Sequence, residues 1–305
     1  MKKIGLSLIA LSALLSAVEF EYGSGTFNMN GGFLGLTGSI GTDVDTFSFV
    51  ERHSNLVDSN AFYSYDFTWL DSKTLKQAQH TYNNMITVAN NFLPKSKVWE
   101  IPEMKYRVKG LDANIRMGYD IIHEDQDNFL GLGLVVGVSM PWIDSSSDAS
   151  PNTEFIEENR DALEQDYGYY KKSKTTIVTY KIGPSINFQK SFNENVSVYG
   201  IGSFAYQTGY IENDYVNSKF SVDGTFQEYN VGLYFTPFTE TYEWGWLTLS
   251  PRIYGTLGYK YSKWDVDEVL INISGAEMSS KILDPLSMKF GFDSSVGYAG
   301  IGYSF

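Results

Sequence analysis

The sequence predicts an all-β protein, an antiparallel up-and-down transmembrane β-barrel of about ten strands. Three observations lead to this prediction. Long segments alternate apolar and polar residues with a period of two. Beyond residue 17, no apolar run reaches the roughly 20 residues that a membrane-spanning helix needs. The connections between segments alternate between short and long, as in barrels with short turns at one end and long loops at the other.

The N-terminus has the pattern of a secretory signal peptide. Lys2 and Lys3 form a charged region, residues 4–15 form a short apolar core, and Ser16 and Ala17 supply small residues for cleavage. The expected organisation is therefore a signal peptide over residues 1–17, followed by one barrel domain over residues 18–305.

The clearest strand covers residues 174–190. Val178, Tyr180 and Ile182 fall on an apolar face, whereas Lys181 and Asn187 fall on a polar one. A tilted strand of about 9–11 residues crosses a bilayer, so this segment is long enough. A soluble β-sandwich also alternates in this way, and it stays open as an alternative. Its strands, however, are usually about 5–6 residues long, which favours the barrel.

Similar patterns recur along the chain, and they predict ten strands. These are residues 31–40, 44–51, 60–70, 103–121, 128–140, 172–190, 195–211, 219–236, 246–261 and 286–305. The first two are separated by a short turn at residues 41–43. The long connections are 71–102, 141–170 and 262–285, and two of them contain helical spacing, at 72–93 and 152–166. We expect short helices there, in the extracellular loops.

The last predicted strand changes its pattern midway. Phe290 and Phe292 are apolar at even positions, but Ala299 and Ile301 are apolar at odd positions. The change falls near Asp293, and either a β-bulge or a tight turn would produce it. A turn would divide the segment into two strands and raise the count to 11 or 12. Eight and twelve strands remain alternatives to ten.

Charge and composition exclude several kinds of function. The net charge is −13, which argues against a nucleic-acid partner because phosphate binding needs a basic surface. The chain has no cysteine, so it has neither disulfides nor thiolate metal sites. His53, His80 and His123 fall in separate connections. We therefore expect no metal, no cofactor and no catalytic residue, and so no enzymatic activity.

An acidic run over residues 144–166 offers oxygen ligands of the kind that calcium prefers. Its spacing matches no calcium-binding loop, and a run of charges is usually a solvated surface.

Charged residues on the polar faces are the candidate site, because they would line the lumen. They are Asp112, Arg116, Asp120, Lys181, Glu228, Arg252, Lys260 and Lys289. Small barrels are filled by side chains, whereas large ones enclose channels. Two interpretations therefore remain: a buried network of ion pairs that plugs the interior, or a narrow pore lined by Arg116, Lys181, Arg252 and Lys260.

Aromatic residues gather near the predicted strand ends, as in the aromatic girdles of membrane barrels. They are Trp69, Trp142, Tyr169, Tyr170, Trp244, Trp246, Tyr259, Tyr261, Trp264, Tyr303 and Phe305.

The C-terminal segment over residues 299–305, with the signal peptide and the aromatic strands, resembles Gram-negative outer-membrane barrel proteins of the porin-like superfamily. The resemblance identifies no subfamily. It implies a bacterial outer-membrane location, with outer-membrane lipid and lipopolysaccharide as partners. It also implies that the barrel-assembly machinery reads an insertion signal made by Ala299, Ile301, Tyr303 and Phe305.

These observations predict a narrow porin-like channel or a structural membrane protein. One alternative is an outer-membrane enzyme that acts at the extracellular rim, where His80 and Asp71 would lie. Another is a surface adhesion or interaction protein that uses the loops at 71–102 and 141–170.

Overall fold

The computed structural model describes most of the chain from residue 17 to residue 304, with gaps in the connections. The described residues are 17–33, 36–55, 59–77, 80–81, 100–101, 104–122, 128–147, 172–213, 218–238, 240–244, 247–250, 252–273, 276–279 and 289–304.

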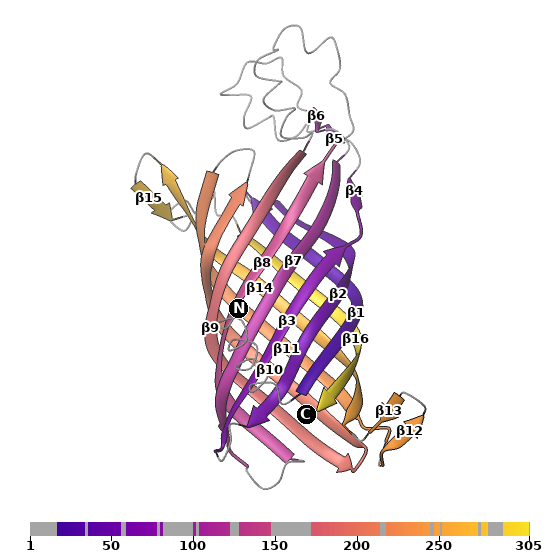
Figure 1. Ribbon diagram of the computed structural model, residues 1–305. Coiled ribbons are helices and arrows are strands. Elements are labelled where there is room, and N and C mark those ends of the chain that lie inside the picture. The colour runs from indigo at the N-terminus through magenta and orange to yellow at the C-terminus, as the bar shows by residue number, and fades with distance from the viewer. Residues whose placement is uncertain are drawn as a thin grey trace, which may run out of the picture.

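Ten long antiparallel strands form one closed barrel (Figure 1). They are β1 (Ala17–Phe33), β2 (Leu36–Asn55), β3 (Ala61–Ser72), β7 (Met104–Asp120), β8 (Asn128–Ser146), β9 (Lys172–Asn193), β10 (Val196–Asn213), β11 (Ser218–Phe235), β14 (Ile253–Ile273) and β16 (Lys289–Ser304). Each strand pairs with the next along this series, and β1 pairs with β16, which closes the ladder. The predicted fold class and strand number are confirmed.

Within the described residues, six short strands lie outside this ring or extend it. β4 (Leu75–Gln77) pairs with β7, and β15 (Ala276–Ser279) extends β14 at the upper end in Figure 1. β5 (His80–Thr81) pairs with β6 (Glu100–Ile101), and β12 (Tyr242–Trp244) pairs with β13 (Leu247–Leu249) at the lower end.

The described residues contain no helix that is long and apolar enough to cross a membrane. The helix expected over residues 72–93 is wrong in its described part, because β4 and β5 are strands. Most of that segment, and all of 152–166, lies outside the described residues, as does most of the acidic run.

The predicted first hairpin is also wrong. Residues 31–40 and 44–51 are not two strands joined at 41–43. The first strand is β1, and β2 runs without a break through Gly41, Thr42 and Asp43, which pair with Asn28, Phe27 and Thr26. Turn-forming residues therefore stay extended here because β1 holds them by a regular ladder. His53, expected in a connection, lies in β2.

Several strands begin or end away from the predicted positions. β8 and β14 continue to Ser146 and Ile273, into segments expected to be loops. β14 begins at Ile253, so residues 246–252 are not part of a barrel strand.

β16 is one continuous strand. Its register with β1 and with β14 runs without a shift from Lys289 to the C-terminal end of the pairing. Neither a bulge nor a turn therefore explains the change of pattern near Asp293. Its explanation is found in what lies inside the barrel at each level.

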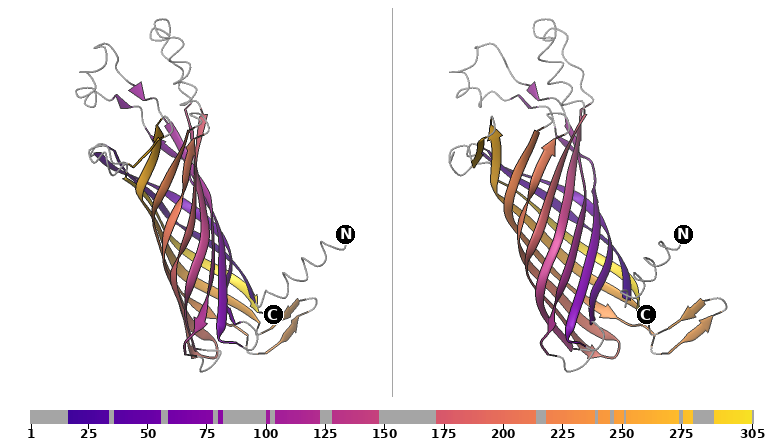
Figure 2. Two further views of the ribbon diagram at one scale, coloured as in Figure 1. Left: turned by 90° about the vertical axis from the view of Figure 1, so that its left-hand side faces the viewer. Right: turned by 60° about the vertical axis from the view of Figure 1, so that its left-hand side comes forward.

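The beginning of β1 and the end of β16 pair at the lower end of the barrel (Figures 1 and 2). The long connections 73–103, 147–171 and 274–288 all join strands at the opposite, upper end. The predicted signal peptide falls almost wholly on residues outside the described part, and stays a prediction.

Candidate functional site

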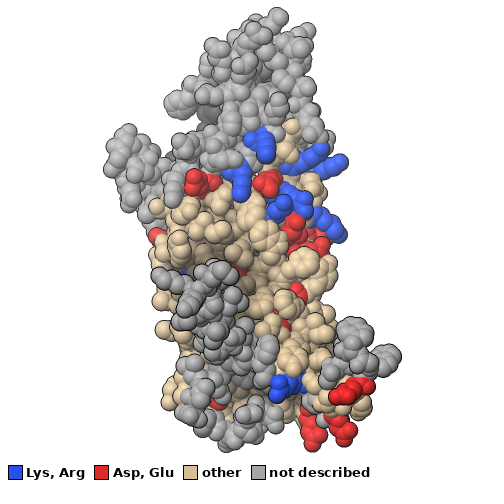
Figure 3. All heavy atoms as spheres, in the orientation of Figure 1, with Lys and Arg blue, Asp and Glu red and all other residues tan. Residues whose placement is uncertain are grey.

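The lower part of the barrel has an apolar outer surface. Large apolar side chains there remain exposed, such as Ile301 at 62% and Tyr180 at 59%. We call this surface the lipid-facing belt. It includes Phe20, Tyr22, Phe47, Ile115, Met117, Tyr119, Leu132, Leu134, Val136, Ile182, Ile186, Phe204, Tyr229, Val231, Leu233, Phe235, Leu257 and Tyr259. On the face shown in Figure 3, described charges are concentrated in the upper part and at the lower rim. A large exposed apolar surface marks a contact with protein or lipid, and around the outside of a closed barrel it suits lipid.

Aromatic residues end the belt on its upper side. The indole rings of Trp69 and Trp142 meet edge to face, with centroids 5.2 Å apart. The hydroxyl of Tyr22 donates to Asp45, and that of Tyr206 donates to Asp223. Aromatic rings with a polar end suit a membrane–water boundary.

Above the belt, the outer face of the same strands becomes polar. β1 continues with Ser24, Thr26 and Asn28, and ion pairs join Lys73 to Asp43 and Arg107 to Asp71. The strands thus extend beyond the apolar zone before they reach the upper loops.

The interior becomes apolar where the outer face becomes polar. At the level of this polar outer face, the inside is packed with apolar side chains, which we call the apolar layer. They are Phe27, Val44, Leu70, Val108, Ile177, Phe226, Trp264, Phe292 and Val296. Phe27 contacts both Trp264 and Phe292 by its ring. The upper part is therefore built like a soluble β-barrel, with apolar residues inside.

Between the lower and upper parts, the apolar and polar faces of the barrel wall exchange places, which we call the inversion. The inversion explains the change of pattern in β16. Phe292 is apolar because it faces the apolar layer inside, whereas Ile301 is apolar because it faces lipid outside. A strand that keeps a strict alternation of faces must then change the parity of its apolar residues where it leaves the membrane.

Below the apolar layer lies a network of buried charges, the central ion cluster. It consists of Asp66, Asp112, Asn114, Arg116, Lys181, Glu228 and Lys260. Arg116 bridges Asp66, at 2.5 Å, and Glu228. Lys181 donates to Asp112 at 2.6 Å. Lys260 lies 2.9 Å from Asp66 and 3.5 Å from Glu228.

The cluster balances its own charge. Three cations, Arg116, Lys181 and Lys260, face three carboxylates, and the amide nitrogen of Asn114, which has two hydrogens to donate, lies within 3.4 Å of all three carboxylates. Buried charges are tolerated when they are paired and hydrogen-bonded. The arrangement therefore holds seven side chains in one fixed set of contacts.

Asp66, Asp112 and Glu228 have one oxygen each within 4.8 Å of the others, close enough to bind a metal ion. The residues around them do not fit that role. Arg116, Lys181 and Lys260 already supply the positive charge that a divalent cation would bring. The donor set therefore favours internal ion pairs over a metal.

The central ion cluster and the apolar layer are joined by specific contacts. The ammonium of Lys181 lies 3.8 Å from the centroid of the Phe226 ring. The indole of Trp264 donates at 2.8 Å to Ser139, whose hydroxyl in turn donates to Asp112. The two layers thus pack directly on each other.

A second charged group, the lower ion cluster, lies nearer the termini. Arg52 donates to Glu19 through two nitrogens, at 3.0 and 2.8 Å, and also to Glu21. Its guanidinium carbon lies 3.8 Å from the centroid of the Tyr199 ring. Glycines admit the rings here, since a Cβ on Gly232 would lie 2.3 Å from the Tyr199 hydroxyl.

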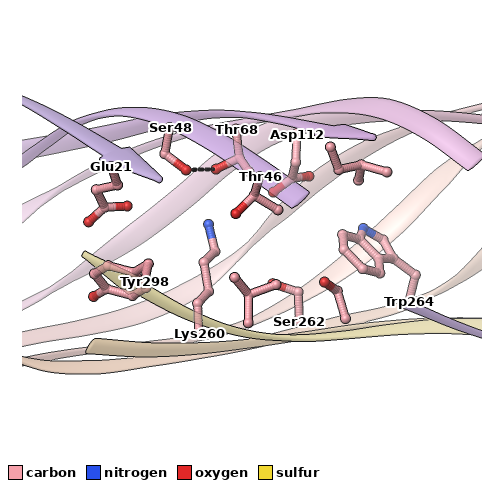
Figure 4. Close-up of a pocket in the computed structure, with 12 residues that line it drawn as sticks. Glu21, Thr46, Ser48, Thr68, Asp112, Lys260, Ser262, Trp264 and Tyr298 are labelled. Carbon is pink, nitrogen blue, oxygen red and sulfur yellow. Dashed lines mark hydrogen bonds between the residues drawn. The ribbon is translucent and has the colours of Figure 1, made fainter. Parts of the chain in front are cut away.

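A small cavity lies beside these contacts and is lined by residues of both ion clusters and of the apolar layer (Figure 4). It has about 30 Å³ open to the centre of a water molecule, enough for about two waters. Lys260 points into it from one wall, opposite Glu21 and the hydrogen-bonded pair Ser48 and Thr68. The remaining lining residues are Thr46, Leu70, Asp112, Ser262, Trp264, Ser294, Val296 and Tyr298.

The structure brings five of the eight candidate residues together in the central ion cluster: Asp112, Arg116, Lys181, Glu228 and Lys260. Asp120 is buried elsewhere and accepts backbone N–H groups of Ile122 and Leu130. Arg252 precedes β14 and is exposed, so its placement on a barrel strand was wrong. The side chain of Lys289 lies outside the described residues.

Sequence reasoning missed Glu19, Glu21 and Arg52, because it began the first strand too late and ended the second too early. The alternation of Glu19 and Glu21 with Phe20 and Tyr22 carries the strand signal. Asp66 and Asn114 were also missed as members. Both stand at alternate polar positions of predicted strands.

The residues of the expected insertion signal form the outer face of the last strand. Ala299, Ile301 and Tyr303 are exposed on β16, and Phe305 lies outside the described residues. Of the expected girdle, Trp69 and Trp142 lie at the upper end of the belt. Trp264 does not, because it is buried in the apolar layer.

No family model matches this sequence, and the comparison with curated proteins gave no match. Three solved structures illustrate the likeness of fold. The outer membrane protease OmpT from Escherichia coli has 8% identity and a TM-score of 0.47, covering 96% of this chain and 98% of that one. Ail, the attachment invasion locus protein of Yersinia pestis, has 11% identity and a TM-score of 0.27, covering 94% and 99%. The toluene transporter TodX of P. putida has 9% identity and a TM-score of 0.24, covering 97% of this chain and 92% of that one.

A protease, an attachment protein and a transporter have no role in common, and likeness at this level carries no argument for a role here. The class follows from the molecule itself. A closed antiparallel ladder of even strand number, an apolar outer belt and a polar interior define a bacterial outer-membrane β-barrel. Both described ends then lie on the periplasmic side, and the long connections face the exterior.

Proposed function

We propose that this protein is a sealed, non-conducting outer-membrane barrel whose upper part serves as a rigid platform for the extracellular loops. The observation that carries this proposal is the filling of the interior at three successive levels. The lower ion cluster, the central ion cluster and the apolar layer are each made of buried side chains that contact one another.

The central level is the strongest support. Arg116 and Glu228 are fully buried, and Lys181 is 2% exposed. A charged lining that conducts ions must be hydrated, whereas these side chains are bound to partners of opposite charge. Of the two interpretations of the lumen, this favours the plug over the pore.

The apolar layer is a further barrier. Phe226 and Phe27 are 0% and 1% exposed within it. Apolar constrictions exclude water, and with it ions. A solute would therefore have to displace both a charged and an apolar layer.

Conductance tests the proposal. Purified protein is inserted into planar bilayers in about 1 M salt. It is expected to give no single-channel conductance steps of the size that open porins give. A matched variant, Phe226→Gly with Trp264→Gly, lacks two rings of the apolar layer. Its heat-dependent migration on gels controls for insertion of the barrel. Regular steps from the unaltered protein would refute the plug.

We also propose that the protein is not an enzyme. The buried carboxylates and cations hold one another in ion pairs, which leaves them poorly suited to proton transfer. The alternative, an enzyme acting at the rim, depended on His80. Its backbone is in β5, but its side chain lies outside the described residues, so a loss of peptidase or lipase activity in a His80→Ala variant would be the evidence for that alternative.

The expected lipid partner has a candidate contact at the upper end of the belt. Lys174 lies 4.8 Å from the ring centroid of Trp142, and Lys109 is the cross-strand partner of Trp142. Two lysines beside an aromatic boundary suit the phosphate groups of outer-leaflet lipid, lipopolysaccharide included. A Lys109→Ala, Lys174→Ala variant should lose co-purifying lipopolysaccharide, whereas Lys76→Ala should retain it.

A further inference from the structure

One connection at the periplasmic end differs from an ordinary turn. Residues 194–195 join β9 to β10 directly, but residues 236–252 join β11 to β14 and contain the β12–β13 hairpin. Periplasmic turns of outer-membrane barrels are usually short. This hairpin therefore needs an explanation beyond chain reversal.

The hairpin has a two-sided pattern. Its ladder pairs Tyr242 with Leu249 and Trp244 with Leu247, and between them it pairs Glu243 with Thr248. In such a ladder, opposed positions and positions two apart share a face. By register alone, four apolar or aromatic positions share one face, and the Glu243–Thr248 pair belongs to the other.

The position of the hairpin is as informative as its pattern. In all three views it leaves the lower end of the barrel sideways, away from the barrel axis, and does not continue the barrel wall downward (Figures 1 and 2). The exposed apolar positions of β11 continue to Phe235, next to this connection. The hairpin thus leaves the barrel at the lower edge of the lipid-facing belt.

The hairpin also continues the lipid-facing belt along the chain. Leu233 and Phe235, both exposed on the belt, are the last outward residues of β11 before this connection. Phe238 follows, and its ring contacts that of Tyr242, which is itself 52% exposed. An apolar surface therefore leads from the barrel wall onto the hairpin.

An isolated two-stranded hairpin is only marginally stable in water. Tyr and Trp side chains are favoured at the membrane–water interface, where the ring meets lipid and the polar atom meets water. A lipid surface would supply the missing apolar contact for one face and leave the acidic face in water.

We infer that the β12–β13 hairpin is an interfacial anchor, which lies in the headgroup region of the periplasmic leaflet with the side of Tyr242 and Trp244 against lipid. Its partner is the phospholipid bilayer itself. The anchor would fix the depth and tilt of the barrel on its periplasmic side.

Tryptophan quenching tests this inference. The chain has six tryptophans, and a variant that keeps Trp244 alone has the other five changed to Phe. It is inserted into vesicles of phosphatidylcholine brominated either near the headgroup or deep in the acyl chain. Fluorescence from Trp244 is expected to fall at least twofold with the shallow bromines, and less with the deep ones.

Two matched variants calibrate the measurement. One keeps only Trp69, which is exposed on the belt and should be quenched by lipid. The other keeps only Trp264, which is buried inside the barrel and should be quenched little. Quenching of Trp244 by aqueous iodide but not by brominated lipid would show a hairpin in water and overturn the inference. Protection from both quenchers would overturn it too, because it would mean that protein covers the hairpin.

Discussion

The lower and upper parts of this barrel are built from the same ten strands but with opposite arrangements of polarity. In the lower part, Val231 and Ile301 face lipid while Arg116 and Glu228 are buried inside. In the upper part, Asp71 and Arg107 pair on the outside while apolar rings fill the interior. The outer face of the barrel thus meets lipid in its lower part and water in its upper part.

The comparison shows that burial has a different meaning in each part. A charge inside the lower part is stabilised by its partners of opposite charge. On the outer face of the same strand it would meet lipid instead. A ring inside the upper part is stabilised by exclusion from water. Substitutions should therefore have effects that depend on level and face more than on residue type.

The largest effect is expected for Arg116→Ala. It would leave Asp66 and Glu228 buried with an excess of negative charge, and the loss of one partner from a buried ion pair costs about 3–5 kcal/mol. Urea unfolding in lipid vesicles, followed by heat-dependent gel migration, measures it. A double variant, Arg116→Met with Glu228→Gln, should recover much of the loss, because it leaves Lys260 paired with Asp66 and Lys181 paired with Asp112. A single variant as stable as the unaltered protein would contradict a paired, dehydrated cluster.

A slightly smaller effect is expected when a charge is placed on the outer face of β11. Val231→Lys puts a cation in the belt and should cost about 2–4 kcal/mol near the bilayer centre. Thr225→Lys lies six residues away on the same face, about 15 Å higher for a tilted strand, and should have little effect. Equal unfolding midpoints for the two variants would contradict a boundary between a lipid-facing and a water-facing part on the outside of β11.

A third effect separates the interior of the upper part from the lipid surface. Val44 is 1% exposed in the apolar layer, and Val44→Ala should cost about 2 kcal/mol through lost burial and the cavity left behind. Val231→Ala makes the same chemical change against fluid lipid, which can fill the space. We expect less than half the loss there, as read from paired unfolding curves. A larger loss at Val231 would argue against the inversion.

The smallest effect is expected for the outer ion pair of the upper part. Lys73 and Asp43 are largely exposed, and such pairs contribute little to stability. Lys73→Ala should leave the unfolding midpoint unchanged while the outer strands keep their register. A fall comparable to that of Arg116→Ala would mean that the upper part depends on its surface charges.

Labelling can map the inversion directly, because the chain has no cysteine. Single cysteines along β16 should react with water-soluble maleimide at Ser295, only with a lipid-soluble reagent at Ile301, and slowly with both at Phe292. The order follows from their places above the belt, on the belt and inside the barrel. Fast aqueous labelling at Phe292→Cys would show an open upper lumen.

Much of the fold could be predicted because strand alternation is a local property. Segments such as 172–190 and 195–211 show their two faces in the sequence, and long connections show the orientation. The first hairpin could not be predicted this way. The residues 41–43 have turn chemistry, and their pairing with β1 holds them extended.

The candidate site was predictable in part for the same reason. Charges at alternate positions identified Asp112, Arg116, Lys181, Glu228 and Lys260 as interior residues. Which of them meet depends on strand tilt and register, since Lys260 contacts Asp66 across 194 positions of sequence. Arg252 and Asp120 have the same pattern yet do not join the cluster.

By itself, then, the sequence determined long strands and the two faces of most of them, because these follow from segment length and period-two patterning, and it favoured a membrane barrel of about ten strands. Only the tertiary structure decided what each face meets. The parity change near Asp293 was visible in the sequence, but its cause was not. It required the closed ladder, which places Phe292 in a dry interior above the membrane and Ile301 against lipid below it, so that apolar residues are favoured on opposite faces of one unbroken strand.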